Sequence, residues 1–272
     1  MVSSSVLVFT GRMGDHNDRG MKGASILGDA LGYLLNVQPT VLGHPEPAIN
    51  GNWDVELAAA LPGLKLLQTA HAAALEQGNS PVFAWPRCAA AIATLPNVAA
   101  LHPDAVVVWF DAHADLNTPE NTTTGYLGGL ALSASLGWWD SGLGMGLDPL
   151  NVVLGGTRDL DPSEQTHIDD ETIAIAAGPT MLSDLDRLVG DRPVYFHLDC
   201  DVLDPGIMPT DYQVPGGLTL ADLTAVASRI ALNPIVGIEI GEFEDHGDQT
   251  RTRSQAKQLV NALSPILFSR RR

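Results

Sequence analysis

The chain has 272 residues, of which 45% are hydrophobic and 17% are charged. These values are ordinary for a globular protein and exclude intrinsic disorder, and this length is near the upper limit for one hydrophobic core. The formal net charge of −17 would repel phosphate backbones and anionic lipids, so we expect neither nucleic acid nor a membrane as a partner. We therefore expect a single domain over residues 1–272.

The cysteine content and the first residues indicate in which cellular compartment the protein is expected. Cys88 and Cys200 are too few for a disulfide scaffold and are compatible with a reducing compartment. The first ten residues lack the basic segment and the long apolar run of a secretory signal. Because no stretch approaches about 20 uninterrupted apolar residues either, a cytoplasmic protein is the expectation.

Short apolar runs alternate with longer helical patterns along the chain. The predicted strands are residues 6–9, 40–42, 82–85, 105–110, 152–155, 173–176, 194–198 and 235–240. Continuous apolar runs suit strands that are buried on both faces, and intervening segments such as 56–75 and 220–231 suit helices that cover a parallel sheet. The sequence thus predicts a three-layer α/β fold with a largely parallel sheet of about eight strands and helices on both faces.

Loops rich in proline and glycine lie between these elements. The most conspicuous are residues 43–52 and 204–217, and the second directly follows a predicted strand. In open parallel sheets, ligands bind beyond the carboxyl ends of the strands. We therefore expect such loops to form the rim of a binding site.

Side chains that can bind metals follow two of the predicted strands, 105–110 and 194–198. They are Asp111, His113, Asp115, Asp199 and Asp201. Alternate residues of an extended backbone point to one side, so both clusters should meet at one edge of the sheet. Four carboxylates gathered there without a cation would repel one another, and one imidazole among oxygens suits Mn, Zn or Fe. The alternative is that they cap helices or loops, but the repetition after two apolar strands favours a metal centre.

Five ligands can hold two ions only if some carboxylates bridge them. Bridging is the arrangement of two-metal hydrolases, in which the ions lie about 3.5–4 Å apart. The pattern therefore favours a binuclear hydrolytic centre over a mononuclear one.

These motifs resemble those of the arginase (ureohydrolase) family. They are DAHAD at 111–115 followed by LNTP, LDCDVLDP at 198–205, GLT at 217–219 and IEIGE at 238–242. They occur in the family order between about residues 81 and 244. The resemblance implies the arginase-type fold and two Mn(II) ions that activate a water molecule for attack on a guanidinium carbon.

The resemblance also implies a role for each metal ligand. Asp111 and Asp199 would bridge the ions, and Asp115 would complete the site of the first ion. His113 and Asp201 would complete the site of the second. Asp115 is also a candidate catalytic residue.

Glu242 matches the family carboxylate that faces the substrate guanidinium, and it is the other candidate catalytic residue. A planar guanidinium favours a carboxylate in bidentate geometry, which agrees with this assignment. Glu244 is a rival for the role. Glu239 lies an odd number of residues from Glu242 and should face the other side of its strand.

The other end of the substrate is predicted from three residues in loops. Asn117 and Thr124 match positions that hold the α-carboxylate in arginases, and Asp161 matches the carboxylate that meets the α-ammonium group. Together they favour an amino-acid substrate over agmatine, which lacks the carboxylate. The alternative is that these polar residues cap turns.

Two positions depart from the common family pattern. Cys88 lies where most members have a histidine ligand of the first metal, and Arg87 lies where an aspartate precedes it. Metal binding deprotonates a thiol, so Cys88 can serve as a ligand, although a small buried cysteine at a helix start is an alternative. A thiolate softens the site and strengthens the case for Zn or Fe against Mn. Gly128 lies where arginases carry a histidine that shuttles protons, and it should leave room beside the guanidine.

Both departures are similar to those of family members that hydrolyse Nω-hydroxy-L-arginine to hydroxyurea and L-ornithine. We therefore expect that guanidino substrate. Hydrolysis of arginine or another guanidino compound, and a binding protein without catalysis, are the alternatives. The trimers and hexamers of the family suggest a homo-oligomer.

Overall fold

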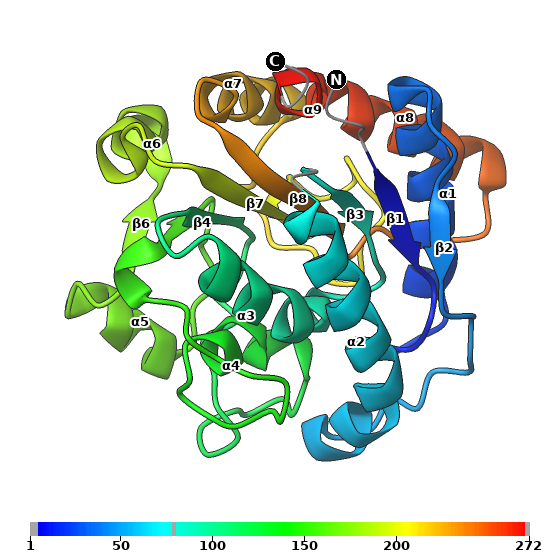
Figure 1. The fold of residues 1–272 in the computed structure, drawn as a ribbon, viewed down its shortest axis with the longest axis horizontal. Coiled ribbons are helices and arrows are strands. Elements are labelled where there is room, and N and C mark those ends of the chain that lie inside the picture. Colours follow the sequence, from blue (N-terminus) through cyan, green and yellow to red (C-terminus); the bar gives the residue numbers. More distant parts are fainter. Residues whose placement is uncertain (1–4, 78–79, 270–272) are drawn as a thin grey trace.

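The computed structural model describes residues 5–77 and 80–269. Within these ranges the chain forms one eight-stranded sheet in the order β2-β1-β3-β8-β7-β4-β5-β6, and every pairing is parallel (Figure 1). The strands are β1 (Val6–Phe9), β2 (Thr40–Leu42), β3 (Val82–Ala84), β4 (Val106–Phe110), β5 (Val152–Gly155), β6 (Ala174–Ala176), β7 (Val194–Asp199) and β8 (Ile235–Gly241). The predicted fold class is confirmed.

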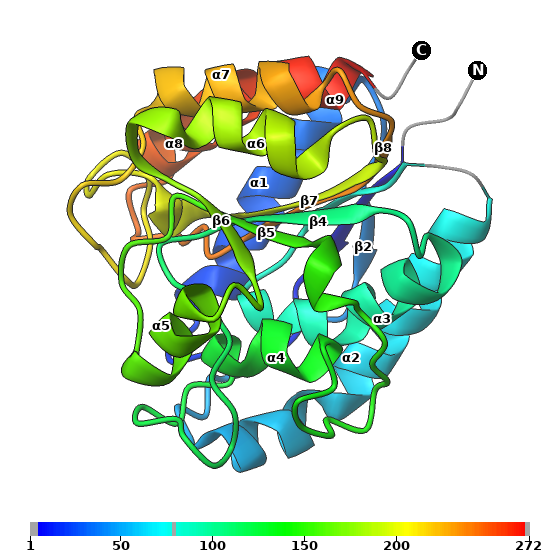
Figure 2. The same cartoon turned by 90° about the vertical axis from the view of Figure 1, so that its left-hand side faces the viewer.

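Helices cover both faces of the sheet and make three layers. The longer ones are α1 (Arg19–Leu35), α2 (Trp53–Glu76), α3 (Ala91–Leu101), α4 (Ala131–Ser135), α5 (Pro162–Asp169), α6 (Met181–Val189), α7 (Leu220–Ile230), α8 (Gln249–Ala262) and α9 (Ser264–Ser269). Figure 2 shows α1, α6, α7, α8 and α9 on one face and the other four helices on the opposite face. Each face has its own apolar core, because the side chains of the buried strands alternate between the two layers.

The predicted strands agree with the structure to within a residue at each end, but β2 is not buried. Thr40 and Val41 are exposed, because β2 is at the edge of the sheet and pairs with β1 alone. β3 ends at Ala84, one residue earlier than predicted. Pro86, which has no backbone N–H to give to a ladder, follows shortly after.

The strand order determines where a site can form. β3 and β4 follow one another along the chain, yet β8 and β7 lie between them in the sheet. Helices on opposite faces thus follow neighbouring strands, and the loops at the carboxyl ends of the central strands separate and leave a crevice. Among the described residues, no helix is both long enough and apolar enough to span a membrane.

Candidate metal centre and substrate pocket

A cavity of about 190 Å³ opens at the carboxyl ends of the central strands. It is lined by Cys88, His113, Asp115, Asn117, Thr124, Tyr126, Gly129, Asp159, Asp161, Glu164, Asp199, Asp201, Tyr212 and Glu242. Nine of the ten residues predicted for the site are in this set. The tenth, Asp111, is fully buried directly after β4.

His113 lies between two carboxylates. Its Nδ1 is 3.1 Å from Oδ2 of Asp201 and 3.4 Å from Oδ1 of Asp111, and the three ligand atoms lie within 4.8 Å of one another. Burial lowers the pKa of His113, but its contacts with the two carboxylates outweigh burial and raise the pKa above the ordinary value. The three ligand atoms thus form a cluster in which a divalent cation could bind.

Cys88 begins the short 3-10 helix Cys88–Ala90 after β3 and points toward the carboxylates. Its Sγ is 3.2 Å from Oδ2 of Asp199 and 3.3 Å from Nε2 of His197. The ligand atoms of Cys88, Asp199 and Glu242 lie within 4.8 Å of one another, and so do those of Cys88, Asp111 and His197. Burial, and then the charge of Asp199, raises the pKa of the Cys88 thiol, so deprotonation requires a bound cation.

Asp115 carries two signs of a functional constraint. Its φ is +53°, a left-handed backbone conformation that residues with a side chain rarely adopt. Its buried Oδ2 has no hydrogen-bond partner among the described residues. Burial and the nearby Asp111 raise the pKa of Asp115. A buried oxygen without a partner is costly, and a cation would offset that cost, so this residue fits a metal site.

Backbone amides orient Asp199, which ends β7, and Asp201, which lies in the 3-10 helix Cys200–Val202 that follows. Asp199 Oδ1 accepts a hydrogen bond from the backbone N–H of Asp201 at 2.7 Å, and Asp201 Oδ1 accepts one from Ala112 at 3.1 Å. The second oxygen of each contacts Cys88 or His113. Burial raises the pKa of Asp199 and of Asp201, and repulsion from neighbouring carboxylates raises both pKa values further.

His197, which the sequence did not single out, contacts the site through Cys88. Its ring stacks on Trp109 with centroids 3.4 Å apart, its Nδ1 is 2.5 Å from Glu239, and its Nε2 faces Cys88. Glu239 is fully buried, also accepts a hydrogen bond from Tyr195, and does not line the cavity. Glu239 therefore faces away from Glu242, as the spacing predicts.

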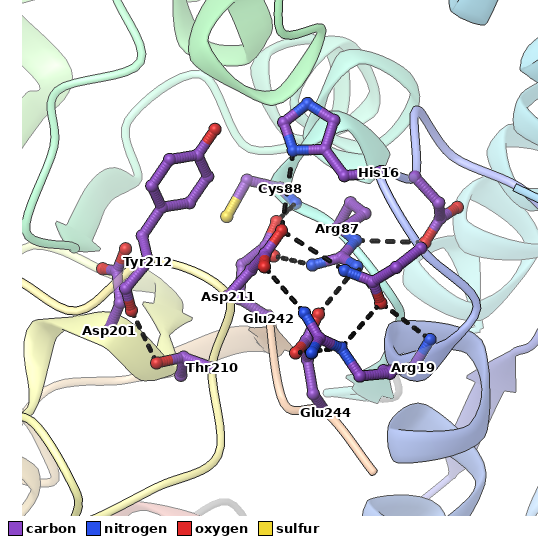
Figure 3. A network of polar contacts seen from close by, with 12 residues as sticks. His16, Arg19, Arg87, Cys88, Asp201, Thr210, Asp211, Tyr212, Glu242 and Glu244 are labelled. Atoms are coloured by element: carbon purple, nitrogen blue, oxygen red, sulfur yellow. Dashed lines mark hydrogen bonds and ion pairs between the residues drawn. The ribbon is translucent and has the colours of Figure 1, made fainter. Parts of the chain in front are cut away.

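A buried arginine holds Glu242. The Arg87 side chain is 1% exposed and contacts three carboxylates. Its Nη1 lies 2.7 Å from Glu242 and its Nη2 lies 2.9 Å from Glu244 (Figure 3). Its Nε lies 3.0 Å from Asp15. Glu242 has a φ of +59° and lines the cavity, whereas Glu244 is paired away from it. Of the two rivals, Glu242 is placed to meet a substrate. The role of Arg87 was missed, although an arginine inside an apolar segment was a signal.

Two of the three residues predicted for the amino-acid end, Asn117 and Asp161, are hydrogen-bonded to each other. Asn117 Nδ2 donates to Asp161 at 2.7 Å, and its Oδ1 accepts from Ser163 at 3.0 Å. Asp161 also caps α5 in a capping box with Glu164, while the exposed Thr124 lies on the rim. Asp161 thus caps a helix and lines the cavity, so the two readings of its sequence are compatible. Sequence reasoning missed Glu164.

Gly128 does not leave the expected room. A Cβ atom built on Gly128 would lie 2.5 Å from Cε1 of Tyr126, because the ring of that tyrosine fills the space. The Tyr126 hydroxyl donates to Oε1 of Glu242 at 2.9 Å. The expectation of an empty space beside the guanidine is therefore wrong, and a tyrosine that the sequence reasoning overlooked occupies it.

The loop 204–217 forms part of the rim, as expected for a segment after a strand. Its Asp211 contacts Arg19 at 2.8 Å and His16 at 3.5 Å (Figure 3). The ring of Tyr212 lies 5.4 Å from that of His113. His16 does not line the cavity. Its contact with Asp211 helps to hold the loop 204–217 in place.

The fold and the site together define a class: α/β proteins with a candidate binuclear metal centre. Thiol, imidazole and carboxylate groups lie at the carboxyl edge of an all-parallel sheet. Within that class, the chain belongs to the arginase family, whose model matches residues 40–264. A protein of Streptomyces lavendulae named N(omega)-hydroxy-L-arginine amidinohydrolase is 36% identical over 261 residues, which cover 96% of each chain. The family binds a binuclear metal centre, and the ligand clusters found here fit one.

Solved structures agree. The arginase from Bacillus cereus has a TM-score of 0.81 and 26% identity, with 97% of each chain covered. The Entamoeba histolytica arginase in complex with L-ornithine has a TM-score of 0.84 and 21% identity, over 97% of this chain and 98% of that one. The latter likeness shows the fold.

Proposed function

We propose that this chain is a metal-dependent amidinohydrolase that cleaves a guanidino amino acid, with Nω-hydroxy-L-arginine as its preferred substrate. Hydrolysis would release hydroxyurea and L-ornithine. The observation that carries the proposal is the position of Cys88, whose Sγ lies 3.2 Å from Asp199 in the wall of the cavity. The Streptomyces lavendulae relative, named for this activity, supports it over nearly the whole chain.

The side chains divide into two ligand sets that share two carboxylates. We assign the first ion to Cys88, Asp111, Asp115 and Asp199, and the second ion to Asp111, His113, Asp199 and Asp201. Bound there, divalent ions would lower the pKa of a water molecule and make it a nucleophile at neutral pH. We propose Mn(II) as the ion, and the thiolate of Cys88 makes Zn or Fe the competitors.

The other polar groups would bind and orient the substrate. Glu242, held by Arg87, faces the guanidine, while Asn117 and Thr124 receive the α-carboxylate and Asp161 the α-ammonium group. Support comes from their placement around the same cavity. Asp115 would bind the first ion through one carboxylate oxygen, and its other oxygen would accept a proton released during water attack.

Cys88 favours a hydroxylated substrate for an electrostatic reason. An N-hydroxyl oxygen that binds strongly to a metal would compete with the attacking water. An anionic thiolate donates more charge than a neutral imidazole and weakens the attraction of the first ion for an additional oxygen ligand. The substrate hydroxyl can then stay in the cavity without displacing the nucleophile.

The experiment is product detection with L-arginine, Nω-hydroxy-L-arginine and agmatine side by side, on protein of measured metal content. We expect hydroxyurea and ornithine to form much faster than urea, and Cys88→His to shift the preference toward arginine. A wild-type enzyme that cleaves arginine at least as well would contradict the proposed substrate. Protein that binds two ions and cleaves none of the three would favour a binding protein.

Three further points belong to this proposal. We propose one domain over residues 1–272, a cytoplasmic location and a homo-oligomer. The eight-stranded sheet that joins early and late segments of the chain supports the first. Light scattering coupled to size-exclusion chromatography tests the last.

A further inference from the structure

The hydrogen bonds of Glu242 leave little capacity for a substrate. Oε2 accepts from Arg87 Nη1 at 2.7 Å. Oε1 accepts from the Cys88 backbone N–H at 3.0 Å and from the Tyr126 hydroxyl at 2.9 Å. A carboxylate has about four acceptor positions, two on each oxygen, so the three donors leave about one. A guanidinium that seeks two parallel hydrogen bonds cannot be fully accepted in this state.

Of these three donors, Tyr126 is the one that can move to another acceptor. The amide of Cys88 is fixed in the backbone, and Arg87 is anchored by Glu244 and Asp15 as well as by Glu242. The Tyr126 hydroxyl lies at the end of a side chain that lines the cavity, and its ring packs against Gly128. A hydroxyl rotates to suit its acceptor, so its donated hydrogen bond can be redirected.

Among guanidine groups, hydroxylation decides whether the substrate offers a good acceptor. The nitrogens of a protonated guanidine donate hydrogen bonds and accept none, whereas an N-hydroxyl oxygen can accept one. We propose that Tyr126 is the residue that distinguishes the two. Its hydroxyl turns from Glu242 to the N-hydroxyl oxygen, and this releases Oε1 for the guanidine N–H groups. With arginine the tyrosine stays on Glu242, and the guanidinium meets a partly occupied carboxylate.

This inference rests on the proposed function and adds the Tyr126 hydroxyl to Cys88 as a second determinant of its selectivity. It also gives Gly128 a purpose. A Cβ there would come within 3.1 Å of the Tyr126 hydroxyl oxygen and 2.5 Å of the ring, so even alanine would displace the tyrosine. The pair of Tyr126 and Gly128 thus replaces an acid/base side chain by a hydrogen-bond donor with two alternative acceptors.

The test is Tyr126→Phe, which keeps the ring and removes the hydroxyl. We expect kcat/KM for Nω-hydroxy-L-arginine to fall about 10- to 100-fold, the size of a lost hydrogen bond to a charged or strongly polar group. The value for L-arginine should stay the same or rise, because Oε1 of Glu242 gains a free position. Tyr33→Phe, at a tyrosine that is 84% exposed on α1, is the matched control and should change neither value.

A second variant and a metal measurement separate selectivity from damage. Gly128→Ala should displace the Tyr126 hydroxyl and change the substrate ratio in the same direction. Elemental analysis should find the wild-type metal content in both variants. An equal fall for both substrates, or an unchanged ratio, would overturn the inference and leave Tyr126 a structural residue.

Failure of the proposed function would look different. If the wild-type enzyme cleaves arginine and not hydroxyarginine, the substrate proposal is wrong, and hydroxyarginine then serves as a competitive inhibitor. Weaker inhibition of Tyr126→Phe at an unchanged KM for arginine would still support the inference. Equal inhibition of both proteins would overturn it. If neither compound is cleaved, calorimetric titration gives the affinity of the wild type and of Tyr126→Phe for each compound. Weaker binding of hydroxyarginine alone by the variant would support the inference, and an equal change for both compounds would overturn it.

Discussion

Replacing Arg87 by leucine tests the buried network that holds Glu242. The side chain is 1% exposed, and three separate nitrogens contact Asp15, Glu242 and Glu244, which are each 5% exposed or less. Leucine fills much of the volume but leaves three buried carboxylates without their shared cation. We expect Arg87→Leu to be strongly destabilised and to bind substrate poorly, because Glu242 loses the group that orients it.

The magnitude follows from what each carboxylate retains. Glu244 keeps Arg19 at 2.9 Å, and Glu242 keeps the hydrogen bond from the Tyr126 hydroxyl. The loss should therefore be close to that of one broken buried ion pair, about 3–5 kcal/mol, and not three times as much. Since a domain is stable by about 5–15 kcal/mol in total, this is a large fraction of the free energy of unfolding.

The assay is urea denaturation of the wild type, Arg87→Leu and Arg87→Lys. Lysine keeps the charge but has one nitrogen in place of three, so it should recover little of the loss. Arg187→Leu, which removes an exposed ion pair with Asp184, is the control and should leave the unfolding midpoint unchanged.

The pH dependence of the deficit gives a second measurement. Burial raises the pKa of Asp15, and Arg87 opposes that rise. Without the arginine, the pKa should rise further, so the folded variant binds protons that the unfolded chain does not. Stability of Arg87→Leu should then fall as pH increases, and its deficit should shrink in mild acid. A loss below about 1 kcal/mol, or a deficit that does not change with pH, would refute this reasoning.

Further predictions address the metals, the substrate and the core. Asp199→Ala should lose both ions because Asp199 is expected to bridge them, and elemental analysis finding two ions in this variant would exclude bridging. Glu242→Gln should keep the metals and raise KM, since an amide lacks the charge that a guanidinium seeks; unchanged kinetics would exclude it as the substrate carboxylate. Gly128→His should fail to create a proton shuttle unless Tyr126 is also made smaller, and pH–rate profiles of the single and double variants test this. Burial lowers the pKa of His71 to about 3 from 6.5, so the unfolded chain takes up a proton first as pH falls between these values, and up to about 5 kcal/mol of stability is lost there. A His71→Gln variant whose unfolding free energy declines just as steeply with acid would contradict that assignment.

Local pattern was enough to predict the sheet and a cluster of four aspartates and one histidine at its edge, whereas the other residues expected around the cavity came from the resemblance to the family. Continuous apolar runs indicate strands buried on both faces, and two aspartate-rich clusters after such strands indicate a metal centre, even though the segment after β4 is not extended and Asp115 has a left-handed backbone. Neither inference requires knowledge of distant parts of the chain. The exposure of β2 was not predictable in this way, because an edge strand and a central strand have similar apolar runs.

The surroundings of the site could not be predicted because they depend on contacts between distant segments. The partners of Arg87 are 72 residues before it and 155 and 157 residues after it. No local spacing relates these positions. The room next to Gly128 was predicted wrongly for a different, local reason: the absence of one side chain does not reveal that the ring of Tyr126, two residues earlier, fills the space.

The strand order also has a consequence for how the chain folds. β7 and β8 are the last strands to be synthesised, yet they occupy the middle of the sheet between β3 and β4. Until they insert, the two outer groups of strands share no ladder, and both β3 and β4 expose an unpaired apolar edge. Such non-local pairing slows folding and exposes intermediates to aggregation. A ribosome-bound chain therefore cannot assemble its metal centre early, and completion of the cavity coincides with completion of the fold.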